Sequence, residues 1–178
     1  MGKIKNEKSR LALGIFLALT TVWMIVIFCF SAQDSTESGS LSGDLLRKLL
    51  AFFNPHWNIM TNSQKILLMS KLHTLFRKLG HFSEYCVLGM LLTLTARRFC
   101  KNRFQQAIPH IIMRTIALPA LLALCYAASD EFHQRFVAGR SCELRDVCID
   151  FTGAALGIVV VTLSAHIIKN KKERVSAK

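Results

Sequence analysis

The chain has 178 residues, of which 52% are hydrophobic, and its formal net charge is +12. The hydrophobic residues stand in continuous runs, which excludes an ordinary soluble domain of this size. The positive charge is gathered in short clusters that flank those runs, which is typical of a membrane surface, so we expect no nucleic-acid partner. The composition predicts an integral membrane protein.

Four apolar runs are about as long as an α-helix that crosses a bilayer, which needs roughly 20 residues. In chain order, these predicted spans cover residues 11–30, 79–96, 113–131 and 147–168. The first run has no charge and is longer than the apolar region of a secretory signal, about 7–15 residues, so we interpret it as a retained anchor. Residues 1–178 are therefore predicted to form one all-α membrane bundle with four transmembrane helices.

Three clusters of Lys and Arg set the predicted orientation of this bundle. They cover residues 3–10, 97–114 and 169–178, and they hold fourteen of the 23 basic side chains but only two acids. The clusters thus carry the whole net charge. With four spans, all three clusters fall on one side of the membrane. The positive-inside rule makes that side the cytoplasm, so both termini are predicted to be cytoplasmic.

The longest segment between predicted spans, residues 31–78, falls on the outer side in this topology. Apolar residues recur at helical spacing from Leu41 to Phe53, and a second such stretch runs from Ser63 to Arg77 among basic residues. Both stretches are typical of amphipathic helices, which would lie on the outer leaflet or pack on the spans. A covering role and a lid over a substrate both stay open.

Ionisable residues inside spans are energetically costly and indicate function. Here they occur in three stretches, and the predicted topology brings all three to the outer face. His81, Glu84 and Tyr85 share one helix face, because their spacing is i, i+3 and i+4. The candidate catalytic residues are His81, Glu84, Asp130, Glu131 and His133. The candidate ligand-binding residues are Lys78, Tyr85, Ser129, Gln134, Arg140, Asp146 and Asp150.

Small residues follow the acids of the last predicted span. Asp146 and Asp150 lie one helical turn apart, and Gly153 and Gly157 come next on the chain. Glycine lets a neighbouring helix approach closely within a membrane. We therefore expect another helix to pack against this part of the fourth span.

These residue types allow several chemistries. Histidine with carboxylates can transfer protons, or bind a divalent metal such as zinc or manganese, although the spacing does not define a complete ligand set. Arg140 suits bidentate recognition of a phosphate or a carboxylate. The same groups could instead be polar pairs that tie the spans together, because lipid offers them no other partner. No cofactor motif is evident, and no feature indicates an oligomeric state.

Four motifs, in their order along the chain, resemble the VanZ-like family of bacterial membrane proteins, which is named for an accessory factor in glycopeptide resistance. The motifs are residues 30–33 with Ser38 and Ser42, then Arg77 to Gly89, then residues 129–134 with Gly139 and Arg140, and finally Asp146 to Gly153. The resemblance implies a multi-pass protein of the bacterial plasma membrane and a role in resistance to teicoplanin-type glycopeptides.

Two classes of function remain open from the sequence. In the first, the outer-face site engages a membrane lipid, a lipid-linked cell-wall precursor or another anionic envelope molecule, with or without hydrolysis or transfer of a phosphate group. In the second, the chain is a non-catalytic envelope scaffold, which holds a glycopeptide or a precursor.

Overall fold

The computed structural model describes residues 2–33, 35–100, 112–138, 140 and 142–176, and the regular elements in these ranges are all helices. The all-α prediction is therefore confirmed. The elements are α1 (Gly2–Ser31), α2 (Ser35–Phe53), the short turn η1 (Trp57–Ile59), α3 (Asn62–Cys100), the π-helical turn η2 (Met113–Ala117), α5 (Leu118–Gln134) and α6 (Leu144–Ser176).

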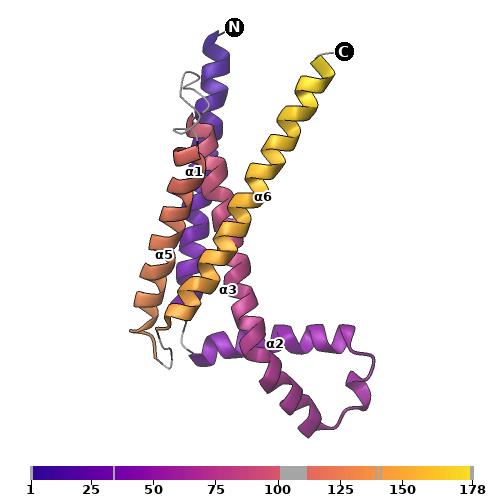
Figure 1. Cartoon of the computed structure of the whole chain (residues 1–178). Helices are drawn as coiled ribbons and strands as arrows, with labels where there is room; N and C mark the ends of the chain where they lie inside the picture. Colours follow the sequence, from indigo (N-terminus) through magenta and orange to yellow (C-terminus); the bar gives the residue numbers. More distant parts are fainter. Residues whose placement is uncertain (1, 34, 101–111, 139, 141, 177–178) are drawn as a thin grey trace.

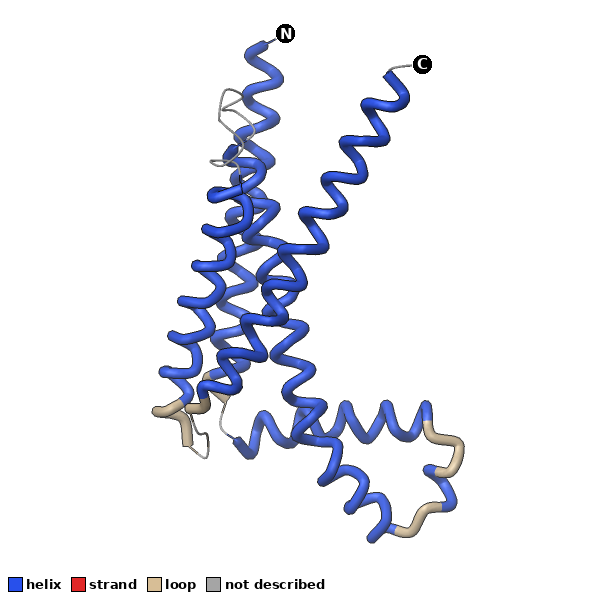
Figure 2. The backbone as a smooth tube through the Cα atoms, in the orientation of Figure 1, coloured by secondary structure: helices blue, strands red, loops and turns tan. Residues whose placement is uncertain are grey.

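The long helices form one elongated bundle (Figures 1 and 2). The helices α1, α5 and α6 run beside the second half of α3. The start of α1 and the end of α6 lie at the same end of the bundle. At the opposite end, α2 and the first half of α3 project to one side.

Among the described residues, three segments are long and apolar enough to cross a membrane: Ser9–Ser31, Met113–Gln134 and Leu144–Ser176. They contain the predicted first, third and fourth spans, so the chain is a multi-pass membrane protein. The predicted second span, 79–96, lies within α3, where polar side chains such as His81 and Glu84 lower the hydropathy. Of the predicted basic clusters, Lys101, Arg103 and Lys178 lie outside the described residues, as does Gly139 of the loop before α6.

The segment between α1 and the bundle part of α3 departs from the prediction in one respect. As predicted, α2 ends at Phe53, just before the Asn-Pro pair. The predicted helix from Ser63 to Arg77, however, is not separate: it is continuous with residues 79–96 in the 39-residue α3. Gly80 lies at the junction of the two stretches, and one glycine within a helix costs only about 1 kcal/mol.

A capping box begins α3. The Gln64 side chain accepts a hydrogen bond from the Thr61 backbone N–H at 2.9 Å, and the Thr61 hydroxyl accepts one from the Gln64 N–H at 3.3 Å. The turn before it is closed by Trp57, which is 6% exposed and lies under the ammonium group of Lys65. Specific side-chain contacts therefore order the connection between α2 and α3.

Three glycines bring α3 and α6 into direct backbone contact. A Cβ atom added to Gly89 would overlap the carbonyl group of Ala154. One added to Gly153 would overlap that of Phe82, and one added to Gly157 would overlap that of Cys86. The expected close approach at Gly153 and Gly157 is confirmed, and the partner is α3. This contact fixes the axial register between α3 and α6.

Hydrogen bonds between side chains and backbone hold α1 in place against α3 and α5. The Trp23 indole donates to the Glu84 carbonyl at 2.9 Å, and the Tyr126 hydroxyl donates to the Met24 carbonyl at 2.6 Å. Ile27, at 1% exposed, packs into the core beside these bonds. Polar groups thus substitute for hydrophobic association, which is weak between helices in lipid.

We expect Gly157→Ala to lower the free energy of unfolding by at least about 1–3 kcal/mol, the usual cost of overpacking. The added methyl group would force α6 away from the Cys86 carbonyl. Gly14→Ala is the matched control, because a methyl group there meets nothing within 4 Å. Thermal unfolding of the purified chain in detergent measures both variants. Equal stability of the two would contradict the α3–α6 contact.

Candidate functional site

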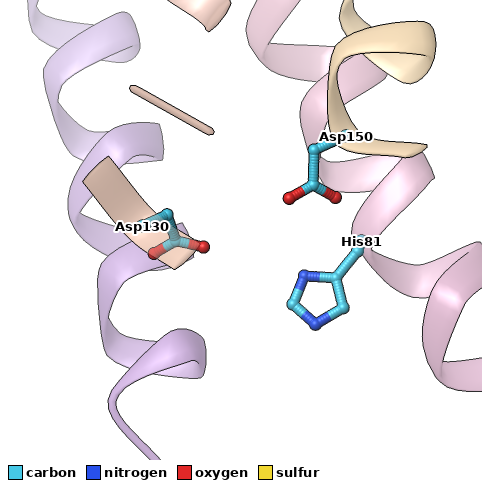
Figure 3. Close-up of side chains that lie close together, drawn as sticks. All are labelled: His81, Asp130 and Asp150. Carbon is cyan, nitrogen blue, oxygen red and sulfur yellow. The ribbon is translucent and has the colours of Figure 1, made fainter. Parts of the chain in front are cut away.

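Three ionisable side chains from three helices meet inside the bundle. They are His81 of α3, Asp130 of α5 and Asp150 of α6, and one ligand atom from each lies within 4.8 Å of the other two. Figure 3 shows the Asp150 carboxylate directed toward the His81 ring, with Asp130 facing both from the other side. Asp130 and Asp150 are only 3% and 1% exposed. We call these three residues the triad.

Most polar atoms of the triad lack a hydrogen-bond partner among the described residues. Both carboxylate oxygens of Asp150, one oxygen of Asp130 and Nδ1 of His81 are buried and unpartnered. The hydroxyl group of Tyr85, a fully buried residue, lies next to Asp130. Buried polar groups in proteins are nearly always paired, because an unpaired one costs free energy. The triad is therefore arranged for something other than pairing within the chain.

Other polar side chains surround Asp130. The Gln134 amide donates to its second oxygen at 3.3 Å, and Ser31, which is 1% exposed, flanks it from the end of α1. His133 stacks on Phe28, with ring centroids 4.7 Å apart. Ser31 was not among the residues predicted for the site. Two signals mark it in the sequence: it belongs to the first of the four motifs, residues 30–33, and it stands where an apolar run gives way to a polar stretch.

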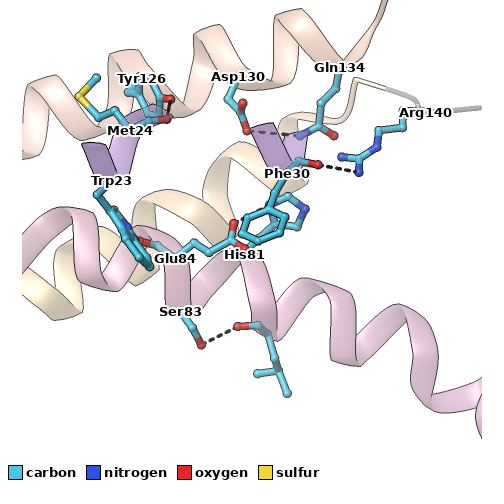
Figure 4. A network of polar contacts seen from close by, with 11 residues as sticks. Trp23, Met24, Phe30, His81, Ser83, Glu84, Tyr126, Asp130, Gln134 and Arg140 are labelled. Atoms are coloured by element: carbon cyan, nitrogen blue, oxygen red, sulfur yellow. Dashed lines mark hydrogen bonds and ion pairs between the residues drawn. The ribbon is translucent and has the colours of Figure 1, made fainter. Parts of the chain in front are cut away.

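A cavity of about 400 Å³ opens beside the triad, between the end of α1, α2 and α3. Its walls are mostly apolar, and its polar groups come from Arg77, His81, Glu84 and Arg140, among others. His81 belongs to both the triad and the cavity wall. Its Nδ1 atom lies 4.0 Å from a Glu84 carboxylate oxygen. Figure 4 shows His81, Glu84 and Arg140 grouped around Phe30 on this side of the bundle.

Arg140 joins the loop before α6 to the end of α1. One of its terminal nitrogens donates to the Phe30 carbonyl at 3.3 Å, while its Nε atom is buried and unpartnered. Burial and the nearby Arg77 guanidinium lower the pKa of Arg140, and the carboxylates of Asp130, Glu131 and Glu84 partly offset this. Arg77 itself makes no ion pair in the described part of the chain. Two neighbouring guanidinium groups with unused donors form a favourable environment for an anion.

Several residues predicted for the site have structural partners instead. Lys78 of α3 forms an ion pair with Asp146 at the start of α6. The buried Glu131 carboxylate accepts a hydrogen bond from the Glu143 N–H at 3.1 Å, just before α6 begins. Ser129 donates to the Tyr126 carbonyl and lines a separate hollow. The predicted residues therefore fall into three groups. The first is the triad with its neighbours. The second comprises the Lys78–Asp146 ion pair and Glu131, which hold the start of α6, and the third is Ser129, which lies apart.

The geometry permits proton transfer, cation binding and anion binding in adjacent places. Histidine beside Glu84 can move a proton, and histidine with two carboxylates can hold a divalent cation. The guanidinium groups of Arg77 and Arg140 can bind a phosphate.

We expect Glu131 to stabilise the fold through its hydrogen bond with the Glu143 backbone N–H. Glu131→Ala removes the acceptor for a backbone N–H group at the start of α6, and we expect a loss of roughly 1–3 kcal/mol in the free energy of unfolding. Glu131→Gln keeps an oxygen acceptor and should retain most of the stability. Thermal unfolding in detergent compares the two. If both variants lose the same stability, the bond to Glu143 is not the role of this side chain.

Comparison with known proteins adds one finding to this geometry. No curated protein and no solved structure matches the chain. The family model described as VanZ/LLP1 matches residues 16–165, which include the cavity, the triad and all of α3. The chain therefore belongs to the VanZ/LLP1 family.

Proposed function

We propose that this protein binds the phosphate-bearing headgroup of a lipid-linked cell-envelope molecule, in the cavity at the outer face of a bacterial plasma membrane. One observation carries the proposal: Arg77 and Arg140 stand on the wall of a largely apolar cavity, and neither has a carboxylate partner among the described residues. An anion that enters the cavity would be held without breaking an ion pair.

The apolar part of the cavity supports a lipid as the source of that anion. Phe30, Leu45, Phe76 and Leu79 form its walls, so that a hydrocarbon chain would leave the headgroup along an apolar path. The helix α2, which provides one wall, ends in Phe52 and Phe53, at 81% and 73% exposed. Exposed aromatic residues on a helix beside a bundle suit the membrane interface.

The position of the cavity in the membrane follows from the charges. The described basic residues near the ends of α3 and α6 lie at the end of the bundle that holds both termini (Figure 1). If α3 also crosses the membrane, the chain has four crossing helices, and the positive-inside rule places this end of the bundle in the cytoplasm. The cavity and the triad lie toward the other end, and this supports an outer-face site.

Catalysis is the second candidate, and the contact between His81 and Glu84 favours it. Both residues line the cavity, so a bound phosphate ester would lie beside a histidine and a carboxylate that could exchange a proton. Hydrolysis or transfer of the phosphate group would then follow binding. Resistance to teicoplanin-type glycopeptides is a narrower proposal, suggested by the family resemblance. Drug susceptibility at matched membrane abundance would test it.

We expect Arg140→Gln and Arg77→Gln each to weaken binding of a phosphate-headed lipid roughly ten- to a hundredfold, since each removes hydrogen bonds from a charged donor. Native mass spectrometry of the full chain with phosphatidic acid or a polyprenyl phosphate measures the affinity, and phosphatidylcholine is the neutral comparison. Arg135→Gln is the matched control, because Arg135 is exposed in the same loop region and its loss changes the net charge equally. Equal weakening by all three variants would count against the cavity.

The topology has its own test. Cys142 is exposed in the loop before α6, so a chain that keeps only this cysteine should react with an impermeant maleimide on intact cells. A second chain that carries only Val175→Cys, near the end of α6, should react only after permeabilisation. The reverse pattern of labelling would move the site to the cytoplasmic face.

A further inference from the structure

We propose that the triad of His81, Asp130 and Asp150 binds one divalent cation of the zinc or manganese type. This inference goes beyond the headgroup cavity and does not depend on it. The triad lies deeper than the cavity, and it draws its ligands from α3, α5 and α6. The two sites touch only at His81, which lines both.

The spacing of the triad is close to what a cation requires. The three ligand atoms lie within 4.8 Å of one another. Around a zinc ion with bonds of 2.0–2.2 Å, neighbouring ligand atoms are about 3.3 Å apart. Rotation of the carboxylate and imidazole side chains can supply the difference. Figure 3 shows that all three side chains are already directed into the same space.

The unpartnered atoms are the second observation, and they point into that space. Asp150 is 1% exposed and neither of its oxygens has a partner, while Asp130 is 3% exposed and one of its oxygens lies beside the Ser31 and Tyr85 hydroxyl groups. The buried Nδ1 atom of His81 has no hydrogen bond either. These are ligand atoms of the correct types, one from each helix, and a cation would satisfy all of them.

The charge around the triad favours a cation. The electrostatic influences on Asp150 come from four acids, Asp130, Glu131, Asp146 and Glu84. The basic residues Arg140, Arg77 and Lys78 act on the His81 side of the triad. Lys78, the nearest lysine on α3, is already paired with Asp146. Two carboxylates buried this deeply need either protons or a compensating positive charge, because an isolated buried charge is costly. A divalent cation supplies it and also binds the histidine.

The ligand chemistry narrows the choice of cation. One imidazole and two carboxylates suit zinc or manganese better than calcium or magnesium, which bind mostly oxygen. Three protein ligands leave a coordination position open, which is the pattern of a zinc site that binds a further group. Because His81 also faces the cavity, that further group would approach from the headgroup side.

The full chain, purified without a histidine tag and exchanged through chelator, can be titrated with Zn²⁺, Mn²⁺ and Co²⁺. We expect about one ion per chain by elemental analysis, and a visible absorption spectrum for the Co²⁺ form with nitrogen and oxygen ligands. Asp150→Asn and His81→Asn should each reduce the bound metal at least tenfold. Asp44→Asn on α2 and His166→Asn on α6 are the matched controls, because both side chains are exposed and outside the triad, and they should bind normally.

Several results would overturn the inference. One is a wild-type chain that binds no metal while it still unfolds cooperatively, since the carboxylates would then hold protons instead. Another is full metal content in Asp150→Asn, which would place the ion elsewhere. The wild-type titration tests metal binding without any variant, so the inference can be tested even if a variant fails to fold. Arg77→Gln should keep its metal, so failure of lipid binding and failure of metal binding are separate outcomes.

Discussion

The backbone contact between α3 and α6 is the constraint on which the rest of the structure depends. Gly89, Gly153 and Gly157 allow the two helices to touch along their carbonyl groups, and this fixes which turn of α3 faces which turn of α6. Because Gly153 lies against Phe82, the neighbouring turns bring His81 opposite Asp150. Without this contact, the polar residues of the two helices would have no defined partners within the membrane.

The triad differs from the other polar groups inside this bundle, because most of its polar atoms have no hydrogen-bond partner among the described residues. Elsewhere, polar groups form hydrogen bonds between helices, as at Trp23 and Tyr126. At the triad, acids from two helices face each other and most of their oxygens remain unpartnered. A fold selected for stability alone would not keep such a cluster, because buried uncompensated charge is destabilising. This difference is the physical reason to assign ligand binding to the triad and a structural role to the pair of Lys78 with Asp146.

Much of this arrangement could be predicted from the sequence, but its division into parts could not. Apolar runs and basic clusters indicated the bundle, and ionisable residues inside the runs indicated His81, Asp130 and Asp150. Helical spacing, however, shows which residues share a face and not which helix that face meets. It therefore could not separate Asp150 in the triad from Glu131, which bonds to the loop before α6. The cavity beside Arg77 was missed because α2, α3 and the end of α1 form it only after the chain folds.

The central claim is that the triad serves a ligand and not the fold, and stability without ligand tests it most directly. The measurement is thermal unfolding of the purified chain in chelator, for wild type, Asp130→Asn, Asp150→Asn and, as a structural comparison, Tyr126→Phe, which loses a hydrogen bond to α1. The account predicts that both Asn variants are at least as stable as wild type, because a neutral amide relieves buried charge, and that Tyr126→Phe is less stable. Asn variants that unfold well below wild type would contradict it and make the triad a structural tie between helices.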